Sequence, residues 1–136
     1  MAEPMQVRTI GVTIRRPWRQ VYDFAAEPRN MPRWASGLGA GLRHEEGEWI
    51  ADGPEGPVRV RFSERNPFGV LDHRVVLAPG VEILVPMRVL PNGDGAEVQL
   101  VLFRQPGVTD ERFAADADWV ARDLEALKRL LEALPD

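Results

Sequence analysis

His73 is the side chain best suited to acid–base chemistry in this sequence, which contains two histidines and no cysteine. It alternates in phase with Leu71, Val75 and Leu77, so we expect it to point toward the apolar face of a strand. An imidazole in apolar surroundings can orient a ligand by hydrogen bonding or act as a general base near neutral pH. The alternative is a buried histidine satisfied by a backbone carbonyl or another neighbour. The spacing leaves both open.

The expected surroundings of His73 follow from the turn at Pro79–Gly80. A hairpin at that turn would place His73 roughly opposite Met87. Tyr22 is a possible helper in catalysis, and Arg88 would be one only if its strand faced the other way. His73 therefore remains a candidate catalytic residue without an identified partner.

Other reactive constellations are missing from the sequence. The absence of cysteine excludes disulfides and thiolate ligands. His44 stands beside Glu45 and Glu46, but this spacing matches no known ligand pattern. No serine occupies a nucleophile elbow. We predict no metal site and no cofactor.

A run of short strands must position His73. Period-two alternation identifies these strands, and turn residues separate them. Asn-Gly and Asp-Gly at 92–95 give the strongest hairpin signal. Strands are expected at 6–15, 41–46, 48–53, 58–65, 70–78, 82–90 and 96–105. Two short helices, 17–26 and 28–35, follow the first strand; Pro17 suits the first turn of one, and Pro32 lies inside the other.

A long helix is expected at the C-terminal end, from about residue 110 to Leu134. Thr109 or Asp110 can cap it. Its apolar stripe recurs every three or four residues: Phe113, Ala117, Val120, Leu124, Leu127, Leu131 and Leu134. Such a stripe needs a broad apolar surface, and a six- or seven-stranded antiparallel sheet supplies one. The fold class is therefore α+β, with a β-barrel and docked helix as the runner-up.

Apart from His73, the inner face of this sheet is predicted to be apolar. In the last strand we favour Val98, Leu100 and Leu102 inward, with Val101 and Phe103 as the alternative phase if a bulge precedes them. The small residues Ala114, Ala117 and Ala121 on the long helix would leave room for a cavity. The residues expected to line a ligand site are Tyr22, Met31, Trp34, Val60, Phe62, His73, Val75, Val85, Met87, Leu100, Ala117, Val120, Ala121 and Leu124.

Length, charge and hydropathy narrow the class of protein. The 136 residues fit one domain spanning 1–136, and the net charge of −4 argues against a nucleic-acid partner. No stretch approaches the ~18 apolar residues of a membrane span, and the first residues do not resemble a signal peptide. We expect a soluble cytoplasmic protein.

The segment from Ile14 to Trp34, with its strand, proline, first helix and second helix ending in tryptophan, resembles the strand-to-helix segment of the START/SRPBCC superfamily. Phe113 to Leu131 resembles its C-terminal helix. The resemblance covers about residues 6–134 and is best to uncharacterised bacterial members of the polyketide cyclase/dehydrase-like kind. It implies a helix-grip fold, in which a curved sheet wraps the long helix and a pocket lies between them.

Three functions are compatible with this resemblance. The first is binding of an apolar or aromatic small molecule or lipid in the cavity between sheet and helix. The second is a cyclase or dehydratase that uses His73 as acid or base. The third is a protein-interaction module with a vestigial pocket, which predicts a filled core and an exposed apolar patch around Trp18 or Trp119.

Overall fold

The computed structural model describes residues 2–36, 41–53 and 56–135, and within them it contains eight strands and a long C-terminal helix, which confirms the α+β class. The elements, in chain order, are β1 (Val7–Ile14), α1 (Trp18–Ala26), the 3₁₀ helix η1 (Pro28–Arg33), β2 (Leu42–Glu45), β3 (Glu48–Gly53), β4 (Gly56–Phe62), β5 (His73–Ala78), β6 (Val81–Val85), β7 (Met87–Asn92), β8 (Gly95–Phe103) and α2 (Asp110–Glu132).

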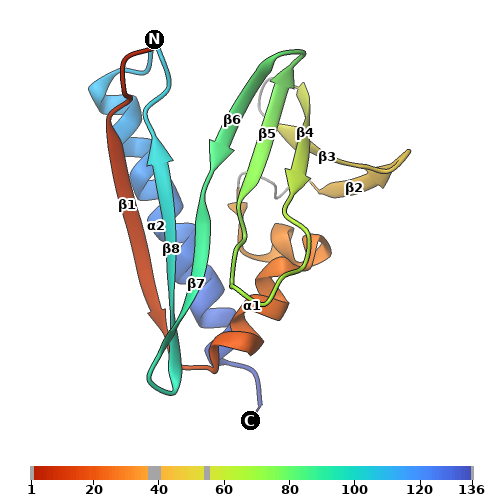
Figure 1. Ribbon diagram of the computed structural model, residues 1–136, viewed down its shortest axis with the longest axis vertical. Coiled ribbons are helices and arrows are strands. Elements are labelled where there is room, and N and C mark those ends of the chain that lie inside the picture. Colours follow the sequence, from red (N-terminus) through yellow and green to blue (C-terminus); the bar gives the residue numbers. More distant parts are fainter. Residues whose placement is uncertain (1, 37–40, 54–55, 136) are drawn as a thin grey trace.

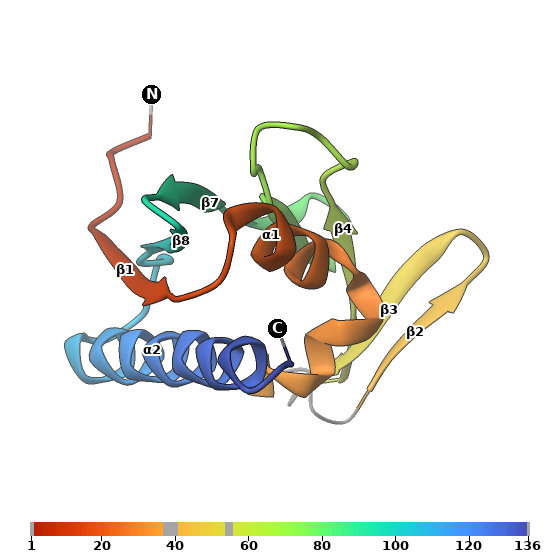
Figure 2. The same ribbon diagram turned by 90° about the horizontal axis from the view of Figure 1, so that it is seen from below.

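The strands form two antiparallel sheets, with the orders β1-β8-β7 and β2-β3-β4-β5-β6 (Figure 1). The loop before β5 connects them, because Leu71 N–H donates to the carbonyl of Met87 and Val89 N–H donates to the carbonyl of Gly69. Figure 2 shows α2 lying along β1, with α1 above the helix in this view and the β2–β3 hairpin extending outward. The sheets therefore curve around one face of α2.

The eighth strand arises because the segment expected as one strand at 82–90 is divided at Pro86. Proline has no N–H to donate to a ladder, so β6 ends at Val85 and β7 begins at Met87 in the other sheet. The strand expected at 70–78 also begins later, at His73. The Asn66 side chain holds the preceding loop by accepting from the N–H groups of Phe68 and Val70.

The helices form where the sequence places caps and prolines. Thr109 Oγ1 accepts from Arg112 N–H at the start of α2, and Asp110 and Glu111 lie in its positively polarised first turn. The second short helix is a 3₁₀ turn of six residues rather than the expected 28–35 helix. Pro32 has no N–H to donate, so a helical hydrogen bond is missing inside this segment.

The core lies between α2 and the three-stranded sheet. Val12 pairs with Val98 and Ile10 with Leu100, and Val98 is completely buried, so the favoured inward phase of β8 is confirmed. Leu77, expected to point inward, is 49% exposed. A register shift between Val76 and Ala78 in the β5–β6 pair reverses the alternation there.

Candidate functional site

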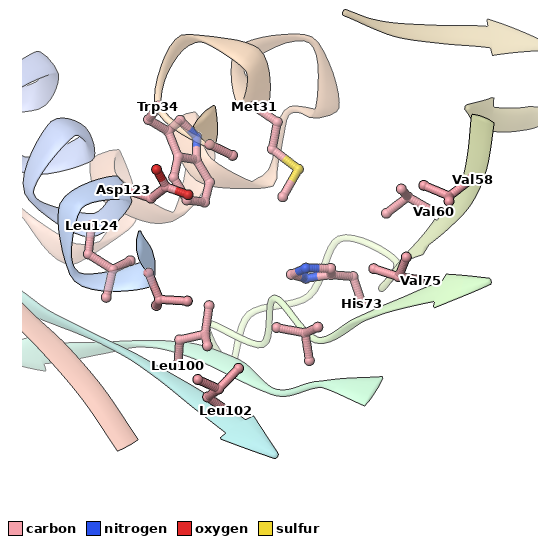
Figure 3. A pocket seen from close by; sticks show the side chains of 13 residues that line it. Met31, Trp34, Val58, Val60, His73, Val75, Leu100, Leu102, Asp123 and Leu124 are labelled. Carbon is pink, nitrogen blue, oxygen red and sulfur yellow. The ribbon is translucent and has the colours of Figure 1, made fainter. Parts of the chain in front are cut away.

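A cavity of about 230 Å³ lies between α2, the end of η1 and the strands β4, β5, β6 and β8 (Figure 3). Its wall is formed by Met31, Trp34, Ala35, Val58, Val60, His73, Val75, Val85, Leu100, Leu102, Val120, Asp123 and Leu124. Ten of these thirteen side chains are apolar aliphatic groups or methionine. The chemistry of the site therefore depends on the other three: Trp34, His73 and Asp123.

The cavity lies along one flank of α2. Val120 and Asp123 face it, whereas Ala121 is exposed and Ala117 is buried outside the wall. At about 100° per residue, Ala121 and Asp123 are about 200° apart around the helix. Ala117 and Ala121, which were expected to line the site, therefore lie outside the cavity wall, because α2 packs against β1 and presents its other flank to the cavity.

His73 projects into the cavity from β5, on the side opposite Asp123 (Figure 3). Its Cα partner across the hairpin is Val85, not Met87, because the register shift between Val76 and Ala78 changes the pairing and β6 ends at Val85. The Nδ1 atom lies 3.2 Å from the carbonyl oxygen of Leu71. A carbonyl oxygen only accepts, so Nδ1 carries the proton in the neutral ring and Nε2 is left as an acceptor.

Burial lowers the pKa of His73 below its ordinary value of 6.5, and the Leu71 carbonyl and the charge of Asp72 offset only part of this shift. The ring is therefore neutral at pH 7. Because the unfolded chain binds a proton more readily than the folded one, the stability associated with the neutral ring is fully present above about pH 6.5. It is lost as the pH falls from there toward the lowered pKa.

Asp123 reaches the cavity from α2 and is held by residues at its edge. Ser36 donates to Asp123 Oδ1 from its N–H, at 3.1 Å, and from its hydroxyl, at 2.6 Å. Trp119 Nε1 donates to the same Ser36 hydroxyl oxygen, so the hydroxyl proton is directed to the carboxylate. Burial raises the pKa of Asp123 above its ordinary value of 3.8, and the Ser36 bonds oppose that shift.

Trp34 and Asp123 belong to two surfaces at once. Both line the cavity, and both also line a groove on the outer side with Trp119, Arg122 and other residues. The Trp119–Ser36–Asp123 chain therefore lies where the cavity approaches the protein surface. The indole nitrogen of Trp34 is itself buried and has no hydrogen-bond partner among the described residues.

Three further residues that were expected to line the site, Tyr22, Phe62 and Met87, lie outside the cavity wall. Tyr22 is 5% exposed, and its Oη accepts from Asn66 N–H at 2.9 Å. Phe62 and Met87 line a separate void of about 20 Å³ on another side of His73. Arg88, the conditional helper, forms an ion pair with Asp72. The residues expected to line the site that do lie in the wall are Met31, Trp34, Val60, His73, Val75, Val85, Leu100, Val120 and Leu124.

Four wall residues were absent from the predicted lining. Strand alternation already placed Val58 and Leu102 inward, so these two were recoverable from the pattern. Ala35 follows η1 and gave no signal. Asp123 gave none either, because a polar residue beside a helical stripe is ordinarily solvated.

The interaction-module hypothesis predicted a filled core, and the cavity contradicts that part of it. Trp119 is 44% exposed, but its nitrogen is bonded to Ser36, and Trp18 is half-buried. Among the residues described, no three histidine or acidic side chains come close enough to hold a metal ion. None of the helices in those ranges is long and apolar enough to cross a membrane.

Nearly the whole chain matches one known protein family. The sequence profile of the family described as polyketide cyclase / dehydrase and lipid transport matches residues 5–134, which bears out the resemblance of residues 14–34 and 113–131. No curated protein matches the chain.

Solved structures agree with this match at the level of the fold. XoxI from Bacillus cereus has a TM-score of 0.76 and 18% identity over 95% of this chain and 97% of its own. Ara h 8.0201 has a TM-score of 0.69 and 9% identity over 96% of this chain and 99% of its own. BexL, a di-domain ARO/CYC from the BE-7585A biosynthetic pathway, has a TM-score of 0.68 and 23% identity over 94% of this chain and 47% of its own.

Proposed function

This chain belongs to the polyketide cyclase / dehydrase and lipid transport family, and on that premise we propose that it binds an apolar or aromatic small molecule or lipid in the cavity between the sheet and α2. The observation that carries the proposal is the cavity itself, with its volume of about 230 Å³ and its predominantly aliphatic wall. Concave, mostly apolar pockets with a few polar groups are the usual form of small-molecule sites.

The energetics favour an apolar occupant. Each methylene that a ligand transfers from water into such a cavity contributes about 0.8 kcal/mol. The wall side chains are set by the sheets and α2, so little ordering is needed when the ligand enters. Val75, Val85 and Val120 supply the branched contact surface, and Met31 adds an adaptable thioether.

The first test is native mass spectrometry of the purified protein, compared with its mass after denaturation. An added stoichiometric mass that disappears on denaturation supports a carrier-type site. Ligand-free protein is then titrated with a panel of aromatic and lipid compounds. Complete failure of that panel, with no copurified mass, would reject the proposal.

A matched pair of variants locates the binding. Val120→Trp fills the cavity and should abolish binding, whereas Ala121→Trp places the same side chain on the exposed flank of α2 and should leave it unchanged. Equal affinity of the two variants would place the ligand elsewhere.

A second candidate is acid–base catalysis of the cyclase or dehydratase type with His73 as the acting group. The favouring observation is that His73 and Asp123 line one cavity from opposite walls, and that Nδ1 of His73 faces the Leu71 carbonyl, which leaves Nε2 as a proton acceptor. The test is dehydration of a β-hydroxyketone, in which the release of water is the measured turnover. Wild-type turnover that His73→Gln abolishes without weakening binding would support catalysis, and binding without wild-type turnover would refute it.

A further inference from the structure

The polar atoms that the cavity offers to a ligand are hydrogen-bond acceptors. His73 presents the unprotonated Nε2, because Nδ1 donates to Leu71, and the opposite wall presents the carboxylate of Asp123 (Figure 3). The one side-chain donor in the wall, Trp34 Nε1, is buried beneath the surface. A ligand that fits this wall must therefore bring its own donor.

The charges around the cavity disfavour an anionic ligand. No lysine or arginine occurs among the described residues that line it. Arg122 interacts with Asp123 but lines the outer groove instead. A carboxylate entering the cavity would lose its water without gaining a cation and would lie in the same void as Asp123, and both effects oppose its burial.

The size of the cavity points to a compact ligand. Its volume of about 230 Å³ lies below the range of about 300–1,000 Å³ that is usual for the sites of drug-sized ligands. That space suits one or two rings better than an extended acyl chain. The walls on either side of His73, formed by Val75 and Val85, are apolar, so a ring system can contact them while one polar group reaches the imidazole.

We propose that the ligand is an uncharged one- or two-ring compound bearing a hydroxyl group that donates its proton to His73 Nε2, and that the cavity rejects carboxylates of the same size. This inference rests on the proposed function, because it specifies the chemistry of the ligand in the same cavity. Each polar group of the pair is then satisfied: the hydroxyl donates, and the ring nitrogen gains the partner that it lacks among the described residues.

Three matched compounds test the proposal by isothermal titration calorimetry at pH 7.5. 2-Naphthol carries a hydroxyl donor, 2-methoxynaphthalene has a similar shape but only accepts, and 2-naphthoate is an anion. We expect 2-naphthol to bind about 10-fold more tightly than 2-methoxynaphthalene, as for one buried neutral hydrogen bond. 2-Naphthoate should bind more than about 100-fold more weakly than 2-naphthol.

The acceptor is tested by His73→Phe, which keeps a ring but removes Nε2. In this variant the preference for 2-naphthol over 2-methoxynaphthalene should fall to within about 2-fold. His44→Phe is the matched control, because His44 is exposed and stacks on Trp49 outside the cavity, with ring centroids 4.6 Å apart. It should keep the wild-type preference. If His73→Phe does not fold, the wild-type ratios still decide whether the cavity prefers a hydroxyl donor and rejects a carboxylate.

The outcomes separate this inference from the proposed function. Equal binding of 2-naphthol and 2-methoxynaphthalene, or tight binding of 2-naphthoate, would overturn the inference while leaving an apolar binding site in place. Binding of none of the three compounds, together with failure of the broader panel, would overturn the proposed function.

Discussion

Replacing Val75 by alanine should destabilise the protein much less than the same replacement at Val98. Val98 is completely buried, belongs to the core cluster and has Val12 and Val89 as its partners on the two neighbouring strands. Val75 also lies between two strands, but its side chain lines the cavity and is not among those packed against that core. Both positions lose the same β-propensity, so the difference between them reports packing.

The expected magnitudes follow from the atoms removed. Two carbons at about 0.8 kcal/mol each give roughly 1.6 kcal/mol of lost transfer free energy, and a new void adds to this at a fully packed site. We therefore expect a loss of about 2.5 kcal/mol for Val98→Ala. For Val75→Ala we expect about 1 kcal/mol, because that side chain already borders a void.

Urea unfolding followed by circular dichroism measures both free energies, using protein refolded from denaturant so that no ligand is carried over. The slope with urea should be the same for both variants. A loss at Val75 as large as that at Val98 would mean that the space beside Val75 is filled in solution, and the reasoning from the cavity would fail.

Three further predictions concern the stability of the protein and the dissociation of its ligand. The free energy of unfolding should fall as the pH drops below about 6.5, because the unfolded chain then takes up a proton that the buried His73 ring resists. Urea midpoints at pH 5.5 and 7.5 measure this change. His73→Phe should flatten the pH profile. Ser36→Ala removes the hydroxyl bond to Asp123 at the cavity edge and should speed ligand dissociation several-fold in stopped-flow displacement; an unchanged rate would show that this edge is not the route. Gly69→Ala should lower the free energy of unfolding in urea by more than about 3 kcal/mol, because the new Cβ would collide with a backbone carbonyl of β7. Gly80 has a similar positive φ but open space around it, so Gly80→Ala should lower the same free energy by about 1 kcal/mol.

Local patterns in the sequence were sufficient for the elements and most of their orientation. The alternation of β8 and the stripe of α2 predicted that Val98 and Leu127 would be buried, and both are completely buried. The Asn-Gly signal predicted the β7–β8 hairpin, in which Asn92 pairs with Gly95. These features depend on periods of two and 3.6 residues that the backbone imposes on any strand or helix, so a single sequence reveals them.

His73 shows where local information ends. Its phase in the strand predicted correctly that it would face inward, and the structure places it in the cavity wall. Its partner across the hairpin was predicted wrongly, because a register shift between Val76 and Ala78 pairs it with Val85, and Met87 belongs to the other sheet. Which ring nitrogen stays free depends on the Leu71 carbonyl, and that contact belongs to the bend before β5.

The position of the cavity was decided only by the tertiary structure. The sequence defined a stripe on α2 but not which of its flanks β1 would cover, so it favoured Ala121 and gave no sign of Asp123. In the structure β1 packs against α2 and leaves the flank with Val120 and Asp123 facing the void. That choice depends on contacts between residues about a hundred positions apart, and no periodicity within a single element carries this information.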